Sequence, residues 1–476
     1  MTPSTPPHAH RTDDRSEEPP RSRGHYVKSV LVGSIGNMIE WFDWFVYSTF
    51  AIYFAGQFFP SDDRTAQLLN TAAIFAVGFL ARPLGGWLLG RLSDRNGRKA
   101  GLTVSVGMMS ASALMIALAP NYETAGNLGA CLLVTARILQ GLSVGGEYAA
   151  SAAYLTEVSK KGWRGLGASF QYISVTLGQL AGLLVLIVLQ FSLSDEQLTS
   201  WGWRVPFAMG AIGAVAVFYL RRGMHETTAY SVAETVDTED RRGTLAEVWR
   251  NRRAAVVVFT LTLGGTVAYY TYTTYLTSYF VNSVGLEKSQ ASTISFIGLV
   301  VFLVLLPIGG YVSDRIGRRP VLIFFGIGTT IGTYPILQGM QNNPTWLTCL
   351  VLTVLGLVFV VGYSSVNAVV KAELFPTGVR TVGVAIPYSI ATAVFGGTAP
   401  YIALAFRDAG RESWFFIYVS ICAAISLITY VFMRETRDVN LIDETVAPGP
   451  HDRAQHSASN GTPIKTVQVD HCYSSL

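Results

Sequence analysis

The stretch "GRLSDRNGRK" at residues 90–99 recurs, little changed, as "GYVSDRIGRR" at residues 310–319. Each copy follows an apolar run long enough to cross a bilayer, since about 20 helical residues span the hydrocarbon core. Two further landmarks recur in the same order: "TEVSKKGWRGLG" (156–167) with "AELFPTGVRTVG" (372–383), and more weakly "HETTAY" (225–230) with "RETRDV" (434–439). Landmarks repeated in order indicate an internal duplication, so the chain is predicted to have two related halves.

The composition points to the membrane. Half of the residues are hydrophobic and only 14% are charged, less charge than a soluble protein of 476 residues needs to cover its surface. We therefore predict an all-α membrane protein with twelve transmembrane helices in two pseudo-symmetric six-helix bundles. The predicted spans are 29–57, 67–91, 100–119, 128–156, 166–191, 202–221, 254–281, 290–312, 320–340, 345–370, 380–405 and 413–433.

The loops predict the orientation. Lysine and arginine gather in alternate loops, as at Lys160 and Lys161, so the positive-inside rule puts both termini in the cytoplasm. The N-terminal stretch is Pro-rich and charged without an apolar core, which argues against a cleaved signal peptide. We expect a multi-pass protein of the bacterial plasma membrane. Its predicted parts are a disordered N-terminal tail (1–27), a first bundle (28–221), a cytoplasmic loop (222–253), a second bundle (254–435) and a disordered C-terminal tail (436–476).

Several function classes are excluded by missing patterns. Cys131, Cys349, Cys422 and Cys472 are scattered, without the spacing of a metal site or a disulfide framework. No phosphate loop, nucleophile elbow or metal-ligand set appears, so we expect neither an enzyme nor a cofactor. The basic residues follow topology, so no nucleic-acid partner is expected. A nutrient sensor on the same scaffold is an alternative, but the chain carries no recognisable signalling domain. We expect the protein to function as a monomer.

The repeated stretches read as tight cytoplasmic hairpins in which glycine allows the turn and an aspartate caps a helix or pairs with arginine. Acidic residues at the ends of the fourth and tenth spans are natural partners for the hairpin arginines. These clusters are expected to form a gate that holds the halves together on one side; the alternative is a topology anchor without a moving role. The residues concerned are Asp94, Arg95, Gly97, Arg98, Glu157, Asp314, Arg315, Gly317, Arg318 and Glu373.

Charged residues also occur inside the predicted spans, where an ionisable group is by default a functional candidate. All of those at depth are expected in the first half, because Lys371 and Glu373 of the second half sit at a helix end. These residues are Glu40, Asp43, Arg82, Arg137 and Glu147. Counting along the helices places the first four of them at a similar depth, near the middle of the membrane and between the repeats.

Charge suggests their roles. Arginine matches a carboxylate, so Arg137 and then Arg82 are candidates to bind a small anionic metabolite. All seven histidines lie in tails or loops, so a membrane proton carrier must be a carboxylate. Asp43 is the first choice, followed by Glu40 and Glu147. Burial favours the neutral form of a carboxyl group and a nearby arginine the ionised form, so such a site can switch. Alternatively, Arg82 with Glu40 holds helices in register, and Glu147 is a packing contact.

Neutral contacts are expected from hydroxyl-rich helices of the second half. "YYTYTTYLTSY" (269–279) offers Tyr272 and Tyr275, and "YSSVN" (363–367) offers similar groups on the tenth span. Tyr388 on the eleventh span and Gln171 on the fifth complete the predicted binding set. For each tyrosine the alternative role is a contact between helices.

On these motifs the chain resembles the major facilitator superfamily over nearly all of residues 28–435. Within it, "GNMIEWFDWFVY" (36–47), "RILQGLSVGGEYAAS" (137–151) and "WGWRVPFAMG" (201–210) look like the metabolite:proton symporter family. The resemblance implies proton-driven import of a small organic acid by alternating access. Arginines facing a charge-poor second half suit a dicarboxylate such as 2-oxoglutarate. Shikimate, citrate and compatible solutes such as proline or betaine are the family's alternatives.

Overall fold

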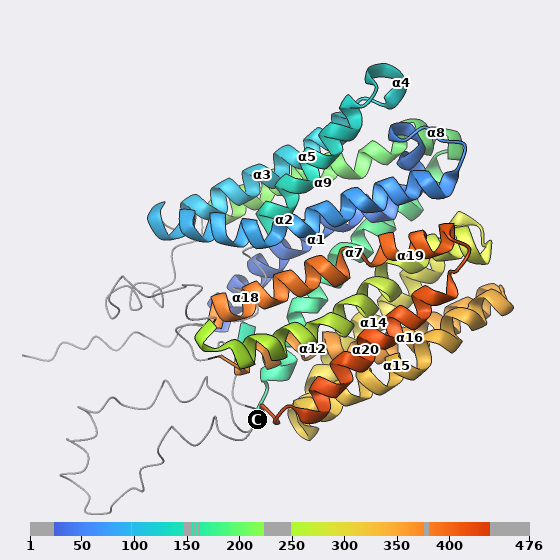
Figure 1. Cartoon of the computed structure of the whole chain (residues 1–476). Helices are drawn as coiled ribbons and strands as arrows, with labels where there is room; N and C mark the ends of the chain where they lie inside the picture. Colours follow the sequence, from blue (N-terminus) through green and yellow to red (C-terminus); the bar gives the residue numbers. More distant parts are fainter. Residues whose placement is uncertain are drawn as a thin grey trace, which may run out of the picture.

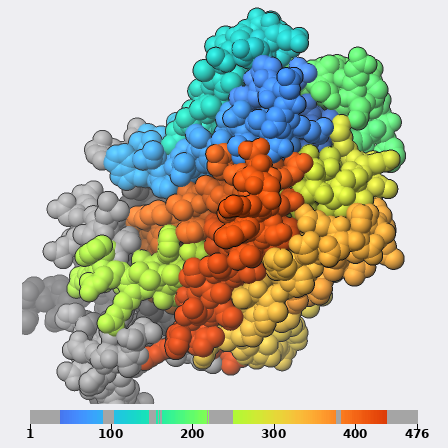
Figure 2. Space-filling model, turned by 45° about the vertical axis from the view of Figure 1, so that its right-hand side comes forward, coloured from blue at the N-terminus to red at the C-terminus, as the bar shows by residue number. Residues whose placement is uncertain are grey.

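The computed structural model describes residues 23–96, 98–145, 155–156, 159, 162–222, 249–375 and 380–437, and every regular element within those ranges is a helix. The helices form two groups that follow the two halves of the sequence (Figure 1). Figure 2 shows the blue-to-green first half above the yellow-to-red second half. In the described part of the chain, eight helices are long and apolar enough to cross a membrane, and two apolar helices, Thr103–Leu118 and Leu128–Val144, are shorter.

The described part of the first half contributes six long helices, with short ones in the connections. Helices α1 and α9 pack against each other, as do α2 and α5, and α3 lies between α5 and α9. The elements are α1 (Arg23–Phe58), α2 (Arg64–Asn96), α3 (Arg98–Leu118), α4 (Tyr122–Ala125), α5 (Leu128–Val144), α7 (Arg164–Ser192), α8 (Asp195–Ser200), η1 (Gly202–Arg204) and α9 (Val205–Arg222).

The described part of the second half also contributes six long spans, three of them interrupted. Three π-helical stretches (η2, η3 and η4) and two turns, at residues 365–366 and 397–398, divide these spans into shorter elements. The elements are α12 (Arg252–Tyr270), η2 (Thr271–Tyr275), α13 (Leu276–Tyr279), η3 (Phe280–Val284), α14 (Lys288–Ile316), α15 (Arg318–Asn342), α16 (Trp346–Ser364), α17 (Asn367–Glu373), α18 (Arg380–Ala391), η4 (Thr392–Gly396), α19 (Ala399–Asp408) and α20 (Ser413–Phe432).

One interruption differs from the sequence prediction. The predicted continuous span 345–370 breaks after Ser364, and α17 starts at Asn367. The Asn367 amide donates to the carbonyl oxygens of Tyr363 and Ser364 (3.2 and 3.1 Å), and the Ser365 hydroxyl donates to that of Val361 (2.8 Å). Polar side chains that bond to the backbone in this way compete with regular helix. The "YSSVN" stretch therefore breaks the helix.

Small residues bring α2 and α5 into backbone contact. A Cβ atom on Gly141 would lie 1.9 Å from the Gly78 carbonyl oxygen, and one on Gly145 would lie 2.0 Å from that of Arg82. Only glycine permits so close an approach, a common device between helices in membranes. The contact places Arg82 and Arg137 beside the same stretch of α1.

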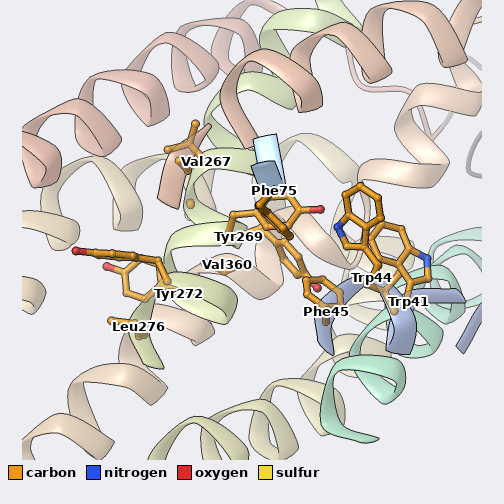
Figure 3. Close-up of a cluster of buried hydrophobic side chains, with 14 of the residues drawn as sticks. Trp41, Trp44, Phe45, Phe75, Val267, Tyr269, Tyr272, Leu276 and Val360 are labelled. Carbon is orange, nitrogen blue, oxygen red and sulfur yellow. The ribbon is translucent and has the colours of Figure 1, made fainter. Parts of the chain in front are cut away.

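The two halves meet through an aromatic layer near the middle of the molecule (Figure 3). Phe79 of α2 packs edge-on against Tyr270 of α12, with ring centroids 5.1 Å apart. Tyr172 of α7 meets Tyr269 in the same way at 5.3 Å. The Gln179 side-chain amide of α7 also donates to the Thr273 carbonyl oxygen in η2 (2.5 Å). A π-helical turn frees backbone carbonyls, and here the opposite half supplies the donor.

Candidate functional site

The centre of the first half holds a hydrogen-bonded chain of three buried side chains. Arg137 Nη1 donates to Gln140 Oε1 (2.7 Å), and Gln140 Nε2 donates to Asp43 Oδ2 (2.5 Å). All three are at most 1% exposed. The α-helical spacing from Arg137 to Gln140 puts both on one face of α5, directed at α1. An arginine and an acid are thus connected through an amide.

Two guanidinium groups share one indole ring. Trp44 lies with its ring centroid 4.0 Å from Cζ of Arg82 and 4.0 Å from Cζ of Arg137. Arg82 also lies 4.0 Å from the centroid of Phe79, and Arg137 lies 4.6 Å from that of Tyr47. Cation–π contacts stabilise a desolvated cation by about 2 kcal/mol or more, which helps to keep two arginines in an apolar layer.

Both guanidinium groups keep unused donors. Nε and Nη2 of Arg82 and of Arg137 are buried and have no hydrogen-bond partner among the described residues. On the acidic side, Asp43 Oδ1 is likewise without a partner there. It faces α9, where a Cβ atom on Gly210 would lie 2.7 Å from it. Buried donors of this kind are costly unless something accepts from them, which suits a site for an anion.

Arg137 and Asp43 do not form a direct ion pair in this structure. Gln140 stands between them, because the Arg137 guanidinium lies over the rings of Trp44, Tyr47 and Phe75. Gln140 was not predicted as a site residue. The signal for it was its spacing of three residues from Arg137 within "RILQG", which puts both on one face of α5.

The remaining predicted binding residues divide into two groups. Glu40 and Gln171 are buried, at 5% and 1% exposure. Tyr388 is buried at 7% exposure on α18, which packs against α2, the helix of Arg82. Tyr272 and Tyr275 lie within the second half, where their hydroxyls contact Thr333 Oγ1 (3.4 Å) and Glu412 Oε1 (3.3 Å). Of the three tyrosines, Tyr388 therefore lies on a helix that borders the helix of Arg82.

Some predicted residues lie outside the described part of the chain. Glu147, Glu157 and Gly97 are not described, and neither are the side chains of Asp94, Arg95 and Arg98. Their suggested roles stay predictions.

Lys371 and Glu373 lie at the C-terminal end of α17, the helix end at which they were expected. Both are nevertheless buried in protein, at 0% and 2% exposure. All seven residues of α17 are buried, so the burial belongs to the whole short helix and not to these two side chains alone. Position along the sequence did not reveal this burial.

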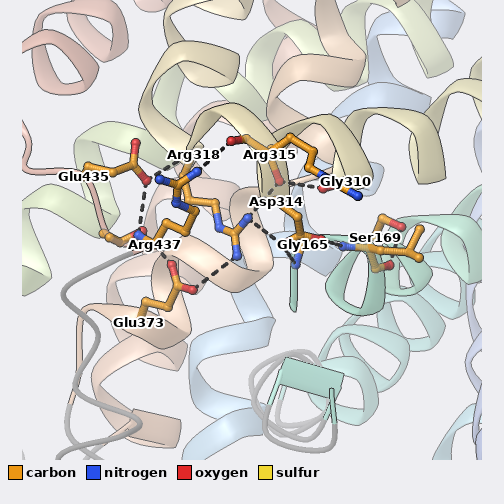
Figure 4. A network of polar contacts seen from close by, with 12 residues as sticks. Gly165, Ser169, Gly310, Asp314, Arg315, Arg318, Glu373, Glu435 and Arg437 are labelled. Atoms are coloured by element: carbon orange, nitrogen blue, oxygen red, sulfur yellow. Dashed lines mark hydrogen bonds and ion pairs between the residues drawn. The ribbon is translucent and has the colours of Figure 1, made fainter. Parts of the chain in front are cut away.

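The second hairpin ties the halves together (Figure 4). Asp314 accepts hydrogen bonds from the backbone N–H groups of Gly165 (2.8 Å) and Leu166 (2.9 Å), in the first turn of α7. Arg318 donates to Asp314 (2.7 Å) and forms an ion pair with Glu373 (3.5 Å). An aspartate at a helix N-terminus satisfies free N–H groups and complements the helix dipole. Asp314 thus caps a helix of the other half.

The hairpin turn itself is held by a residue not predicted from the sequence. Gly317 adopts φ = 105°, and Glu435 accepts from the next two backbone N–H groups, those of Arg318 (2.7 Å) and Arg319 (2.9 Å). Arg437 donates to the Arg315 carbonyl oxygen (2.7 Å). The repeated "HET" and "RET" triplets were a signal for Glu435 that remained unused.

Other contacts join the halves at the opposite end of the helices. Lys288 of α14 pairs with Asp195 of α8 (2.7 Å). Arg407 of α19 contacts Thr65 Oγ1 of α2 (3.4 Å) and donates to the Asn282 carbonyl oxygen (2.7 Å). The halves are therefore in contact at both ends and across the aromatic layer.

Two duplicated helical halves, a buried polar centre beside their interface and contacts at both ends define a secondary transporter. The sequence model of the sugar (and other) transporter family matches residues 29–247 and again 232–446. The chain belongs to that family. It is a multi-pass transporter of the bacterial cytoplasmic membrane and not an enzyme.

Curated relatives align along most of the chain. It is 44% identical over 416 residues to the alpha-ketoglutarate permease of Escherichia coli strain K12, covering 87% of this chain and 95% of the relative. It is 33% identical over 425 residues to the citrate-proton symporter of Salmonella typhi, covering 88% and 97%. Identity to the proline/betaine transporter of E. coli strain K12 is 28% over 460 residues, covering 94% and 89%.

Solved structures share the fold at lower identity. The xylose transporter XylE from E. coli, in a partially occluded inward-open conformation, superposes with a TM-score of 0.70 at 20% identity, covering 87% of this chain and 99% of that one. The proton:xylose symporter XylE bound to 6-bromo-6-deoxy-D-glucose gives 0.71 at 18%, covering 90% and 100%. The chain therefore has the major facilitator fold, as the repeated hairpins predicted.

Proposed function

We propose that the protein imports a small organic dianion together with a proton, and that 2-oxoglutarate is its leading substrate. The observation that carries this proposal is the pair of buried arginines with unused donors beside a carboxyl group that is linked to one of them. The similarity to an alpha-ketoglutarate permease supports the same substrate class. The proton gradient drives transport without a cofactor, and a single chain is the working unit.

Arg137 and Arg82 bind the anion. Their free Nε and Nη2 atoms offer two-pronged hydrogen bonds of the geometry that a carboxylate accepts. Gln171 and Tyr388 add neutral contacts next to them. Tyr272 and Tyr275 contact the substrate only in another conformation, in which the second half has turned towards the two arginines.

Asp43 carries the proton, with Glu40 and Glu147 as the other candidates. In the empty carrier, Arg137 favours ionised Asp43 through Gln140. A substrate carboxylate that engages Arg137 removes this support, and buried Asp43 then favours its neutral, protonated form. Proton and anion load together as a result, and only the empty or fully loaded carrier changes its exposed face.

The two bundles, 28–221 and 254–435, move as the two bodies of alternating access. The Asp314 cap on α7 holds them together on the hairpin side, where Asp94, Arg95, Gly97, Arg98 and Glu157 form the matching cluster of the first half. Arg315, Gly317, Arg318 and Glu373 shape the second. Breaking these contacts exposes the site to the cytoplasm.

Uptake of labelled 2-oxoglutarate into proteoliposomes with an imposed pH gradient tests the proposal. Unlabelled 2-oxoglutarate, citrate, shikimate, proline and betaine serve as competitors. We expect 2-oxoglutarate to compete best and accumulation to vanish when the gradient is collapsed. Competition by proline or betaine alone would overturn the substrate class.

The proton role has its own test. Asp43→Asn should abolish proton-driven accumulation while leaving exchange of internal for external substrate. The exposed Asp195→Asn is the matched control and should leave accumulation unchanged. If both Asp43→Asn and Glu40→Gln still accumulate substrate, a carboxyl group of α1 does not carry the proton.

A further inference from the structure

Phe79 of α2 lies against a glycine of the opposite half. A Cβ atom on Gly397, which directly follows η4, would lie 2.4 Å from Cβ and from Cγ of Phe79. Gly397 has φ = −65° and ψ = −31°, an ordinary helical conformation, so glycine serves here by leaving space and not by its backbone freedom. Tyr270 packs edge-on against the same phenyl ring, with centroids 5.1 Å apart. Gly397 and Tyr270 therefore form a socket in the second half that holds Phe79.

A second glycine leaves space behind the socket. A Cβ atom on Gly396 would lie 3.0 Å from Cδ2 and from Cε2 of Tyr270, so a larger residue there would displace the tyrosine ring. Phe79 itself is 0% exposed. The fit between α2 and the second half at this point thus depends on two adjacent glycines.

The Phe79 ring also contacts the proposed anion site. Its centroid lies 4.0 Å from Cζ of Arg82, which follows three residues later on α2, and 4.8 Å from the Trp44 ring. Residues three apart lie on one face of a helix. One side chain thus contacts both the socket in the second half and a guanidinium group of the first.

Aromatic rings flank the Arg82 guanidinium. Its Nε and Nη2 atoms have no hydrogen-bond partner among the described residues, so no bond to these two atoms fixes their direction. Cζ lies 4.0 Å from the ring centroids of both Phe79 and Trp44. Cation–π contacts strengthen when the cation is desolvated, so a shift of the Phe79 ring changes where the free donors of Arg82 point.

We propose that Phe79 is a positioning residue through which the second half controls Arg82, an inference that rests on the proposed function. While Phe79 lies in the socket, Arg82 directs its free donors at the substrate carboxylate. When α2 and η4 separate, the ring leaves the socket and Arg82 loses this orientation, so the carrier binds the anion more weakly. The substrate in turn favours the conformation with a filled socket, because it binds that conformation better.

Gly397→Ala tests the proposal, because its Cβ atom would displace Phe79 without altering a charged side chain. Affinity is measured on the purified full chain by competition with labelled 2-oxoglutarate. We expect binding to weaken about tenfold, as for one misplaced charge-assisted hydrogen bond. Unchanged affinity would overturn the proposal.

The same substitution in an Arg82→Lys background separates positioning from packing. A lysine ammonium is a point charge with rotatable donors, so it depends much less on orientation than the planar guanidinium. Gly397→Ala should therefore weaken binding by less than about twofold when Arg82 is replaced by lysine, a non-additive result. Equal losses in both backgrounds would mean that Gly397 acts through packing alone, and would overturn the proposal.

Gly310→Ala is the matched control, because it overpacks a different contact between the halves. Its Cβ atom would lie 2.6 Å from the Gly165 carbonyl oxygen of α7, beside the hairpin (Figure 4). Any loss of affinity that it causes should be the same with Arg82 and with Arg82→Lys. A loss that depended on Arg82 here too would show that overpacking anywhere between the halves disturbs the site, which contradicts a specific role of Phe79.

Phe79→Leu covers the case in which Gly397→Ala does not fold. It removes the ring beside Arg82 and adds no volume to the socket. We expect about tenfold weaker binding of 2-oxoglutarate, again only with arginine at position 82. Wild-type affinity in this variant contradicts the inference.

The two proposals fail in different ways. If the wild type binds proline or betaine and ignores 2-oxoglutarate, the proposed function is refuted, and the inference with it. If the wild type binds 2-oxoglutarate and Arg82→Lys weakens this binding, but Gly397→Ala and Phe79→Leu bind it as the wild type does, only the role of Phe79 is refuted.

Discussion

Only one oxygen of the Asp43 carboxyl group has a hydrogen-bond partner among the described residues. Gln140 donates to Oδ2, whereas Oδ1 lies against Gly210 of α9, where the lack of a side chain leaves it room. A carboxyl group that takes up and releases a proton needs one oxygen free of a permanent partner. Gly210 therefore sets the space in which the proposed proton carrier works.

Gly210→Ala should disturb proton coupling without removing any charged group. The added Cβ atom would lie 2.7 Å from Asp43 Oδ1, so the carboxyl group must move, weakening its hydrogen bond to Gln140. Proton-driven accumulation of 2-oxoglutarate should fall severalfold more than substrate exchange. Gly213→Ala on the same helix is the control, because its Cβ would meet only the apolar side chain of Ile39, whose nearest atom would lie 3.1 Å away. Equal behaviour of the two variants would contradict the argument.

Gln140→Glu should weaken anion binding. The new carboxylate would have almost the shape of the amide but would carry a charge beside Arg137, where it competes with the substrate. Loss of one charge-assisted contact corresponds to about tenfold or more in affinity. Gln140→Leu removes the link without adding charge, and its affinity should fall less. Competition binding to the two purified variants distinguishes these results, and a Gln140→Leu loss as large as that of Gln140→Glu would count against the competition.

At this scale, charge patterns in the sequence identified Asp43, Arg82 and Arg137, because an ionisable residue in an apolar span is conspicuous. They did not identify the relay through Gln140 or the indole of Trp44 between the arginines. Both depend on side-chain geometry between α1, α2 and α5, which the order of residues along the chain does not specify.

Helices α2 and α5 show how an element positions the site. Their backbones touch at Gly78, Gly141 and Gly145, which fixes the distance between Arg82 and Arg137 across Trp44. The sequence displays these glycines, but it does not say which helix each one faces.

Gly141→Ala should lower thermal stability. Its Cβ atom would lie 1.9 Å from the Gly78 carbonyl oxygen, and overpacking of this kind costs about 1–3 kcal/mol or more. Gly107→Ala on α3 is the control, since its Cβ would meet nothing within 4 Å and alanine favours helix over glycine. Melting curves of the purified variants should show a clear decrease for Gly141→Ala and none for Gly107→Ala. A similar melting temperature for both would mean that α2 and α5 separate easily.

At the level of helices, the hydropathy pattern predicted the spans but not the breaks within them. Apolar runs gave usable bounds for most spans, because length and hydropathy alone decide which segments cross a bilayer. They missed the break after Ser364, since serine and asparagine bond to the backbone only in a particular local geometry.

For the whole molecule, the contacts between the halves differ in strength at the two ends. On the hairpin side, Asp314 and Arg318 are each 2% exposed, and Asp314 caps α7 of the other half. At the opposite end, Lys288 and Asp195 are 25% and 73% exposed. Exposed ion pairs contribute about 0–1 kcal/mol and are screened by salt, whereas charge-assisted bonds to buried groups contribute more. The duplicated hairpins predicted a gate, but the sequence did not show that it would be the stronger contact.

Asp314→Asn should therefore loosen the hairpin side far more than Asp195→Asn loosens the other. The substitution removes the negative charge that accepts hydrogen bonds from two backbone N–H groups and from Arg318. Glu373 still forms an ion pair with Arg318, so the variant should fold. Hydrogen exchange at the amides of Gly165 and Leu166 reports the opening directly. It should accelerate about tenfold or more in Asp314→Asn and hardly change in Asp195→Asn, whose small effect should also vanish in high salt. Slow exchange at both amides in Asp314→Asn would mean that the other contacts between the halves hold them together without the Asp314 charge, and that the hairpin serves as a topology anchor.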